Sequence, residues 1–397
     1  MPDRRTPCLT LLAVLLSGPA NAVELLEDRL TLNLFGSLGQ SRSSLDAPRY
    51  RNLSINDYGL DRQWSGALDQ RYGLQLNLAL NEQMALIGQG LVHRNSLDET
   101  EWQTTWAYWR WQLDEHWQTS LGRFRHPLFM ITEEFDIGYA WPWVRPPVEL
   151  YSLTGESTYM DGGKLRWQTA LSSYTLALTG FSGDLHINRK PRIEYDTQIS
   201  GIEAHLTDGN LTLRASLLQA DVQLDSQRLE GLIGLIDAQN PAVAEDYAVD
   251  DIDGQRYTNL GMRYEDGRWL VMAEYVRLWL QSRALPDKQA YYLTVGHNFG
   301  DFTPYATYAR QEVVDSLNEY RLTGIPAQAT NALLASSNTE QHTYSLGVRW
   351  DFYPGMALKG QIDQVYQKAP SLGLQGASLP DGRDHFTVTS FVLDWAF

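Results

Sequence analysis

The sequence predicts an all-β fold, a transmembrane up-and-down antiparallel β-barrel of 16 strands. Segments of strand length alternate apolar and polar side chains, as in residues 74–80, where leucine takes every second position. The connections between such segments alternate between short turns and long polar stretches. The chain also ends on such a segment, because Phe391, Leu393, Trp395 and Phe397 are apolar at alternate positions. In a soluble sheet this edge would invite pairing with other chains, whereas a closed barrel has no edge and turns the row toward lipid.

The first 22 residues carry the features of a secretory signal peptide. Arg4 and Arg5 precede an apolar core at residues 9–16, and a stretch of small residues ends at Ala22. This pattern predicts that residues 1–22 are removed and that residues 23–397 form one barrel domain. The only cysteine, Cys8, falls in the removed segment, so the remaining chain has no thiol for a disulfide or a thiolate metal site.

The composition narrows the class of protein. The formal net charge of −16 argues against nucleic acid or an anionic membrane surface as the partner. No segment after Ala22 approaches the roughly 18 consecutive apolar residues that a membrane helix needs. The chain nevertheless carries 13 Trp, 21 Tyr and 11 Phe, which alternating strands with one face toward lipid explain.

Fifteen connections join the predicted strands, the first of which lies around residues 30–38. Seven connections are short and rich in Asp, Asn and Gly, as hairpin turns are, at residues 81–83, 114–116, 169–172, 207–210, 265–268, 300–301 and 351–355. Eight longer stretches alternate with them, at residues 39–65, 95–101, 126–157, 182–196, 221–255, 280–289, 311–341 and 367–384. This alternation is typical of a barrel with both chain ends on the side of the short turns. Residues 229–236 are compatible with a short helix.

Aromatic residues recur beside the short turns. Trp111 and Trp117 flank one turn, and Tyr264 and Trp269 flank another. The same position is shared by Phe299, Phe302, Trp350, Phe352, Tyr353 and Phe397. Aromatic rings favour the headgroup zone of a membrane, so the recurrence predicts a belt at one interface.

The whole mature chain resembles the Gram-negative trimeric porins, which are sixteen-stranded outer-membrane barrels. The resemblance is carried by the first strand, the hairpin series, the long third loop and the terminal strand closing on Phe397. It implies residence in the outer membrane of a Gram-negative bacterium among lipid and lipopolysaccharide, assembly as a homotrimer, and recognition of the terminal strand by the barrel-assembly machinery. It also implies that the loop at residues 126–157 folds into the lumen as a constriction. Without such a loop, a barrel of this width leaves an open aqueous channel.

Charged residues of the wall and of the third loop are the candidate pore residues. Strand parity turns one set of basic side chains inward, namely Arg110, Lys164, Arg166, Arg214, Arg263, Arg349 and Lys359. The loop contributes the acids Glu133, Glu134 and Asp136. Facing one another, these two sets would create a transverse field that selects solutes by size and charge. Individually, the basic residues could instead solvate the wall or pair with inward acids such as Glu203, Glu274 and Asp363. Parity does not assign a face to Arg71, Arg94, Arg123, Arg125 or Arg310, because bulges and strand ends shift it.

Passive diffusion of small hydrophilic solutes and ions is the predicted function, with no catalytic residues, metal or cofactor. One alternative is a channel specific for sugars or small carboxylates, in which Trp141 and Trp143 would stack on sugar rings. A second is an outer-membrane enzyme, but neither a nucleophile elbow nor an HExxH pair occurs. A third is an adhesin that uses the acidic stretch 221–255 to bind divalent cations, although its spacing does not match an EF-hand.

Overall fold

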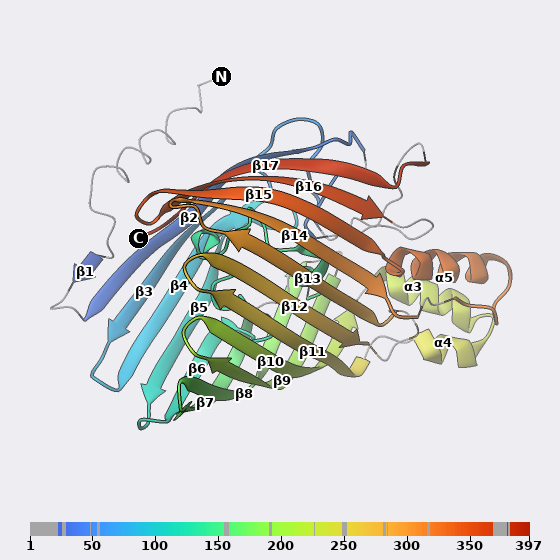
Figure 1. Cartoon of the computed structure of the whole chain (residues 1–397). Helices are drawn as coiled ribbons and strands as arrows, with labels where there is room; N and C mark the ends of the chain where they lie inside the picture. Colours follow the sequence, from blue (N-terminus) through green and yellow to red (C-terminus); the bar gives the residue numbers. More distant parts are fainter. Residues whose placement is uncertain are drawn as a thin grey trace, which may run out of the picture.

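The computed structural model describes residues 23–25, 29–47, 49–53, 56–154, 159–189, 193–225, 227–247, 252–280, 283, 285–315, 318–367, 379 and 382–397. Sixteen of its strands form the barrel (Figure 1). They are β2 (Leu30–Ser43), β3 (Arg71–Ala79), β4 (Met84–Arg94), β5 (Thr100–Gln112), β6 (Trp117–Arg125), β7 (Tyr159–Leu171), β8 (Tyr174–Arg189), β9 (Ile193–Thr207), β10 (Leu211–Asp225), β11 (Ile252–Glu265), β12 (Trp269–Trp279), β13 (Lys288–His297), β14 (Phe302–Val313), β15 (Gln341–Tyr353), β16 (Met356–Gln367) and β17 (His385–Ala396). The predicted signal segment, residues 1–22, lies outside the described residues. A short β1 (Val23–Leu25) pairs with β2.

The barrel is closed by its first and last strands. Each strand from β2 to β17 pairs antiparallel with the next, and β17 pairs with β2 from Val388↔Ser43 to Ala396↔Phe35. The terminal residue takes part as well, because Phe397 N–H donates to the Leu34 carbonyl at 2.8 Å. The predicted closed barrel of 16 strands is therefore confirmed.

All seven predicted turns join neighbouring strands, and four of them share one local cause. The carboxylates of Asp114, Asp208 and Asp266 and the amide oxygen of Asn81 each accept backbone N–H groups two and three residues further along. These side-chain bonds replace backbone bonds that a tight reversal cannot make. The short turns and the C-terminus lie at one end of the barrel, called the turn end here, and the opposite end is the loop end (Figure 1).

One of the eight predicted long stretches is wrong. Residues 182–196 belong mainly to β8 and β9, which pair from Thr175↔Thr207 to Arg189↔Ile193. Only residues 190–192 separate the two strands, and these lie outside the described residues. The segment is polar because the hairpin extends beyond the apolar part of the wall, so outward positions such as Asp184 and His186 no longer need to be apolar.

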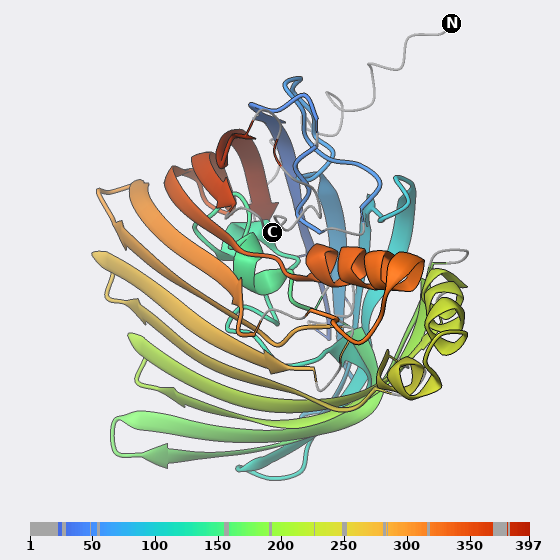
Figure 2. The same ribbon diagram turned by 90° about the vertical axis from the view of Figure 1, so that its right-hand side faces the viewer.

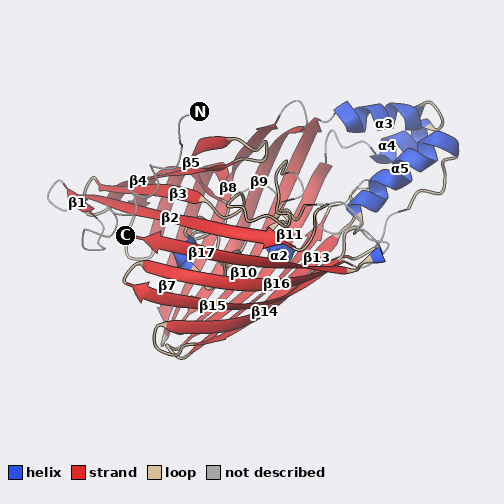
Figure 3. Ribbon diagram, turned by 90° about the horizontal axis from the view of Figure 1, so that it is seen from above, coloured by secondary structure: helices blue, strands red, loops and turns tan. Residues whose placement is uncertain are grey.

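Two long connections at the loop end form a small helical cap (Figure 3). It contains α3 (Gln227–Asp237), which includes the predicted helix, together with α4 (Pro241–Tyr247) and α5 (Gly324–Ser337), which were not predicted. Ile236, Tyr247 and Leu334 belong to its own apolar core. Among the described residues, no helix is long and apolar enough to cross a membrane.

The outer face of the barrel is apolar. Leucine, isoleucine and aromatic side chains are exposed at alternate positions of many strands, including Leu121, Ile202, Leu260, Leu346 and Phe391. The aromatic residues predicted beside the turns lie at the turn end, and several are exposed, for example Trp269, Phe302 and Trp350. Phe302 and Trp350 stack at 5.5 Å between ring centroids. This surface fits the hydrocarbon and one interface of a bilayer.

Candidate functional site: the lumen loop and the cavity beside it

The connection between β6 and β7 folds into the barrel, as predicted. This lumen loop, residues 126–154, contains a short 3-10 helix, η1 (Gly138–Ala140), and α2 (Val148–Tyr151). It lies inside the ring of strands (Figure 2). Its apolar side chains are almost fully buried against inward side chains of β8 to β14; the loop contributes Leu128, Ile131, Trp141, Trp143 and Leu150, and the wall contributes Phe181, Leu218, Met272, Val276, Ala290, Tyr292 and Ala309. The loop is therefore a packed part of the structure.

Two buried charged residues of the wall hold the beginning of the lumen loop. The Glu274 carboxylate of β12 accepts the Met130 N–H at 2.6 Å and also bonds the hydroxyl of Tyr151. The Arg214 guanidinium of β10 donates to the Phe129 carbonyl and pairs with Glu203 of β9 at 2.6 Å. Both wall residues were predicted to point inward, and the loop backbone supplies the polar partners that buried charges require.

Lys359 of β16 holds the middle of the loop. Its ammonium group donates to the carbonyls of Gly138 and Trp141 at 2.7 Å each and of Trp143 at 3.0 Å. It also pairs with Asp394 of β17 at 2.8 Å, and the Lys359 side chain is 0% exposed. On the neighbouring strand β15, Arg349 donates to the Trp141 carbonyl at 3.1 Å.

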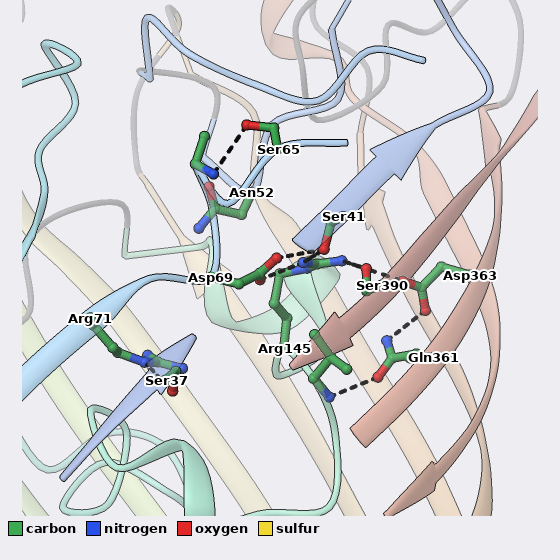
Figure 4. Close-up of polar contacts among 12 residues, drawn as sticks. Ser37, Ser41, Asn52, Ser65, Asp69, Arg71, Arg145, Gln361, Asp363 and Ser390 are labelled. Atoms are coloured by element: carbon green, nitrogen blue, oxygen red, sulfur yellow. Dashed lines mark hydrogen bonds and ion pairs between the residues drawn. The ribbon is translucent and has the colours of Figure 1, made fainter. Parts of the chain in front are cut away.

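Arg145 ties the loop to the strands that close the barrel. Its guanidinium bonds Ser41 of β2 at 3.1 Å and Ser390 of β17 at 2.5 Å. It forms an ion pair with Asp69, just before β3, and lies 3.9 Å from the carboxylate of Asp363 on β16 (Figure 4). Arg145 is buried, so these bonds are made away from bulk water. Sequence reasoning did not single out this residue.

The three predicted loop acids have different surroundings. The Glu133 side chain is 67% exposed, and its carboxylate lies 3.4 Å from the ammonium of Lys164. Glu134 is half-buried, within electrostatic range of Arg263. Asp136 is buried and bonds Arg125 at 2.8 Å and the hydroxyl of Tyr159 at 2.9 Å.

The predicted basic residues fall into two groups. Arg214, Arg349 and Lys359 carry the contacts to the loop described above, and their charged groups are largely enclosed. Arg110, Lys164, Arg166 and Arg263 are partly or fully exposed and lie at inward positions of β5, β7 and β11. In the barrel register Ser120 of β6 lies between Arg110 and Lys164, which places these charges on one stretch of wall.

The two predicted loop tryptophans are enclosed. Trp141 and Trp143 are each 1% exposed. The Trp143 indole N–H donates to Thr294 at 2.9 Å and to Thr307 at 3.1 Å. The guanidinium of Arg71 lies over the Trp141 ring, 5.3 Å from the ring centre. Neither ring offers the free face that stacking on a sugar needs.

A polar cavity of about 420 Å³ lies between the lumen loop and the β3 to β8 side of the barrel. Its lining includes Arg71, His93, Arg123, Arg125, Asp136 and Asp161. Arg123 pairs with Asp161 at 2.6 Å, near the point where the ladder between β5 and β6 stops at Ala107↔Arg123. The sequence left the faces of Arg71, Arg123 and Arg125 unassigned. Arg123 continues the outward row of Leu121, whereas Arg125 at the end of β6 bonds Asp136 of the lumen loop.

The described residues contain no group of three or more His, Cys, Asp or Glu that could hold a metal ion. The acidic stretch predicted as a possible cation site, residues 221–255, forms the loop-end parts of β10 and β11 with α3 and α4, and residues 226 and 248–251 of it are not described. Within it, Asp246 pairs with Arg321 at 2.6 Å.

The closed barrel of 16 strands with a loop packed in its lumen is the fold of the Gram-negative porins, which are channels of the outer membrane. Among solved structures with this fold, in-vitro folded OmpT, an outer membrane protein of Vibrio cholerae, matches 95% of this chain and 100% of its own at 13% identity and a TM-score of 0.55. The anion-selective porin from Comamonas acidovorans matches 93% of this chain and 100% of its own at 13% identity and a TM-score of 0.52. Neither models of known protein families nor curated proteins match the sequence.

Proposed function

We propose that the chain forms a water-filled channel of the outer membrane for passive diffusion of small hydrophilic solutes and ions. One observation carries the proposal: the lumen loop packs against the β8 to β14 side of the barrel and leaves a polar cavity along the β3 to β8 side. The loop narrows the lumen without filling it. Nothing in this mechanism requires a bond to be made or broken, or an energy source.

Charge near the loop sets the selectivity in this proposal. Arg110, Lys164 and Arg166 present basic groups on one stretch of the wall, and the exposed acid that faces them from the loop is Glu133. Facing charges of opposite sign orient the water between them, so an apolar solute crosses only by disturbing that water. The excess of basic groups on this wall favours anions at the constriction.

Planar-bilayer recording of the purified full-length protein tests the channel. Stable ohmic openings are expected, and their absence would reject diffusion through the barrel. In a salt gradient, the reversal potential should have the sign of anion preference. The double variant K164E/R166E should move it toward cations, whereas R310E, which changes an outward residue paired with Glu312 at 2.5 Å, should leave it unchanged.

A channel specific for sugars or small carboxylates is the second candidate. The burial of both loop tryptophans removes the stacking surface on which the sugar version depended. The arginines of the cavity could still bind carboxylates in a bidentate manner. Conductance that is blocked saturably by one solute class, and not by others of the same size, would replace general diffusion with this function.

Assembly as a homotrimer, export through the signal segment 1–22 and recognition of the Phe397 strand by the barrel-assembly machinery complete the proposal. They are supported by the resemblance to porins. Chemical cross-linking in native membranes should give trimers, and removing Phe397 should reduce the amount of folded protein in the outer membrane. Monomers alone, or unchanged folding without Phe397, would contradict these two parts separately.

A further inference from the structure

One arginine of the polar cavity beside the lumen loop has no carboxylate partner. Arg71 of β3 is half-buried and forms no ion pair with a described residue. The other arginines that line the cavity each pair with a carboxylate: Arg94 with Asp98, Arg123 with Asp161, Arg125 with Asp136, and Arg145 with Asp69. Arg71 is therefore an uncompensated positive charge in the lining of the cavity.

The guanidinium of Arg71 is held in one orientation. Its Nε–H donates to the Ser37 hydroxyl at 3.3 Å, and the group lies over the Trp141 ring, 5.3 Å from the ring centre (Figure 4). Ser37 is 0% exposed and in turn donates to Asp394, so it is itself fixed. These contacts use one of the five N–H groups of a guanidinium. The two Nη groups remain side by side, in the geometry that binds the two oxygens of a carboxylate.

Two further carboxylates of this region do not compensate Arg71. Glu101 of β5 lies on the same inward row, but one of its oxygens is 3.9 Å from the His93 ring and the other accepts the Asn95 amide at 3.0 Å. Asp184 of β8 lines the cavity from an outward position, on the other side of the wall from Arg71. An anionic solute is thus complementary to the Arg71 guanidinium.

The cavity also has an apolar lining. Leu91 of β4 and Leu68 contribute to it from the barrel side, and Phe135 and Val148 contribute from the lumen loop. An apolar group placed between these side chains is removed from water, which is favourable. A single unpaired cation beside an apolar lining fits a solute with one negative charge and an apolar body. A sugar would leave hydroxyl groups against these apolar side chains without partners.

The cavity lies closer to the loop end than the basic residues that set the selectivity in the proposed function. Arg71 is opposite His93 of β4, whereas Arg110 is opposite Ala85 of the same strand. These positions are eight residues apart (93 − 85), or about 26 Å at about 3.3 Å per residue. Neither Arg110 nor Lys164 is part of the lining of the cavity. A solute that enters from the loop end therefore meets Arg71 first.

We propose that the cavity binds a small monocarboxylate with an apolar or aromatic body, with its carboxylate on the Nη groups of Arg71 and its body against Leu91 and Val148. The volume of about 420 Å³ is within the range of small-molecule sites. This inference rests on the proposed function, because the solute reaches Arg71 through the water-filled lumen. The site adds a preference for one solute class at the loop-end entry, and other small solutes and ions still diffuse through.

A saturation-transfer NMR titration of the folded full-length protein in neutral detergent tests the site, with empty micelles as the blank. The probe is benzoate. Acetate, which lacks the ring, and benzyl alcohol, which lacks the charge, are the matched compounds. Benzoate should bind saturably, and each matched compound should have a Kd at least about tenfold higher.

Substitutions separate the charged part of the site from the apolar part. R71Q should raise the Kd for benzoate at least about tenfold and leave benzyl alcohol unchanged. R71K should fall between, because an ammonium keeps the charge but not the planar fork. V148T places a hydroxyl in the apolar lining and should raise the Kd for benzoate about threefold without changing that for acetate.

The matched control is R42Q. Arg42 of β2 also lies over a tryptophan, 5.0 Å from the centre of the Trp64 ring, but it is exposed at an outward position. This variant should bind benzoate as the wild type does. Single-channel recording of each variant, made in parallel, shows whether the barrel is folded and open.

Three results would overturn the site: equal affinity for benzoate and benzyl alcohol, no effect of R71Q, or tighter binding of inorganic phosphate than of benzoate. Stable channel openings without benzoate binding would reject this site and leave the channel proposal intact. Binding of benzoate that depends on Arg71, in a barrel that shows no openings, would support the site and reject the channel.

Discussion

Replacing Lys359 by methionine should loosen the lumen loop more than any substitution of an exposed charge. The ammonium has three N–H groups and lies within hydrogen-bond distance of three loop carbonyls and the Asp394 carboxylate. Lys359 and Asp394 are 0% and 1% exposed, so water cannot replace the lost bonds. Removing one partner of a buried ion pair typically costs about 3 to 5 kcal/mol. We expect K359M to lower the free energy of unfolding by this amount.

Urea unfolding in lipid vesicles, followed by tryptophan fluorescence, measures the change. Single-channel recordings should show added noise or extra conductance levels, because the carbonyls around η1 and Trp143 lose their donor. The double variant K359M/D394N should recover part of the stability, since an amide at position 394 is neutral and still accepts from the Ser37 hydroxyl, now 2.5 Å away.

The control is R62M, which removes an exposed ion pair with Asp46 at 3.1 Å. Exposed pairs contribute about 0 to 1 kcal/mol. If K359M behaves like R62M, with a stability loss below about 1 kcal/mol and unchanged current noise, then Lys359 does not hold the loop, and the reasoning from its burial fails.

Three further outcomes are expected. L346R, at an outward position that is 68% exposed, should cost roughly 2 to 4 kcal/mol of unfolding free energy in vesicles, whereas an arginine on a water-facing surface would cost almost nothing. G122A should destabilise the barrel, because the φ of Gly122 is 130° and an added Cβ would lie 2.3 Å from the Ala107 carbonyl; unchanged urea unfolding would contradict this. The hydrogen bond from Arg321 lowers the pKa of Glu319 to about 2, so the folded cap binds fewer protons than the unfolded one and its stability is lost as pH falls from about 4.5 toward 2. Hydrogen exchange in α3 to α5, corrected for intrinsic rates, should rise over that range in the wild type and not in E319Q.

The sequence predicted the barrel well because lipid imposes one rule on every membrane-embedded strand. Leu165 and Leu213 had to face hydrocarbon, which turned Arg166 and Arg214 inward. Alternation of apolar outward residues is not required where a strand extends beyond the apolar band. The polar ends of β8 and β9 were therefore predicted, wrongly, to be a loop. The alternation also fails at the end of β6, where Arg125 has the parity of the outward residues Leu121 and Arg123 but bonds Asp136 of the lumen loop.

The roles of the inward charges depended on contacts that no local pattern contains. Lys359 and Arg110 have the same parity signal, yet Lys359 is enclosed by a loop more than 200 residues earlier and Arg110 is exposed. Strand alternation reports which side of the wall a residue faces. It does not report which segment of the chain packs on that side, and this decides whether a charge is a structural anchor or is in contact with water.

Arg145 has a consequence for the order of folding. It bonds a serine of the first barrel strand and a serine of the last, which are 349 positions apart along the chain (390 − 41). Its partners are thus brought together only when the two ends of the sheet meet. The loop cannot make both bonds before the barrel is closed. Once they are made, Arg145 links β2 and β17, the two strands whose pairing closes the barrel. Separating β2 from β17 therefore also requires breaking the bonds of the Arg145 guanidinium, so the lumen loop stabilises the pairing of the first and last barrel strands.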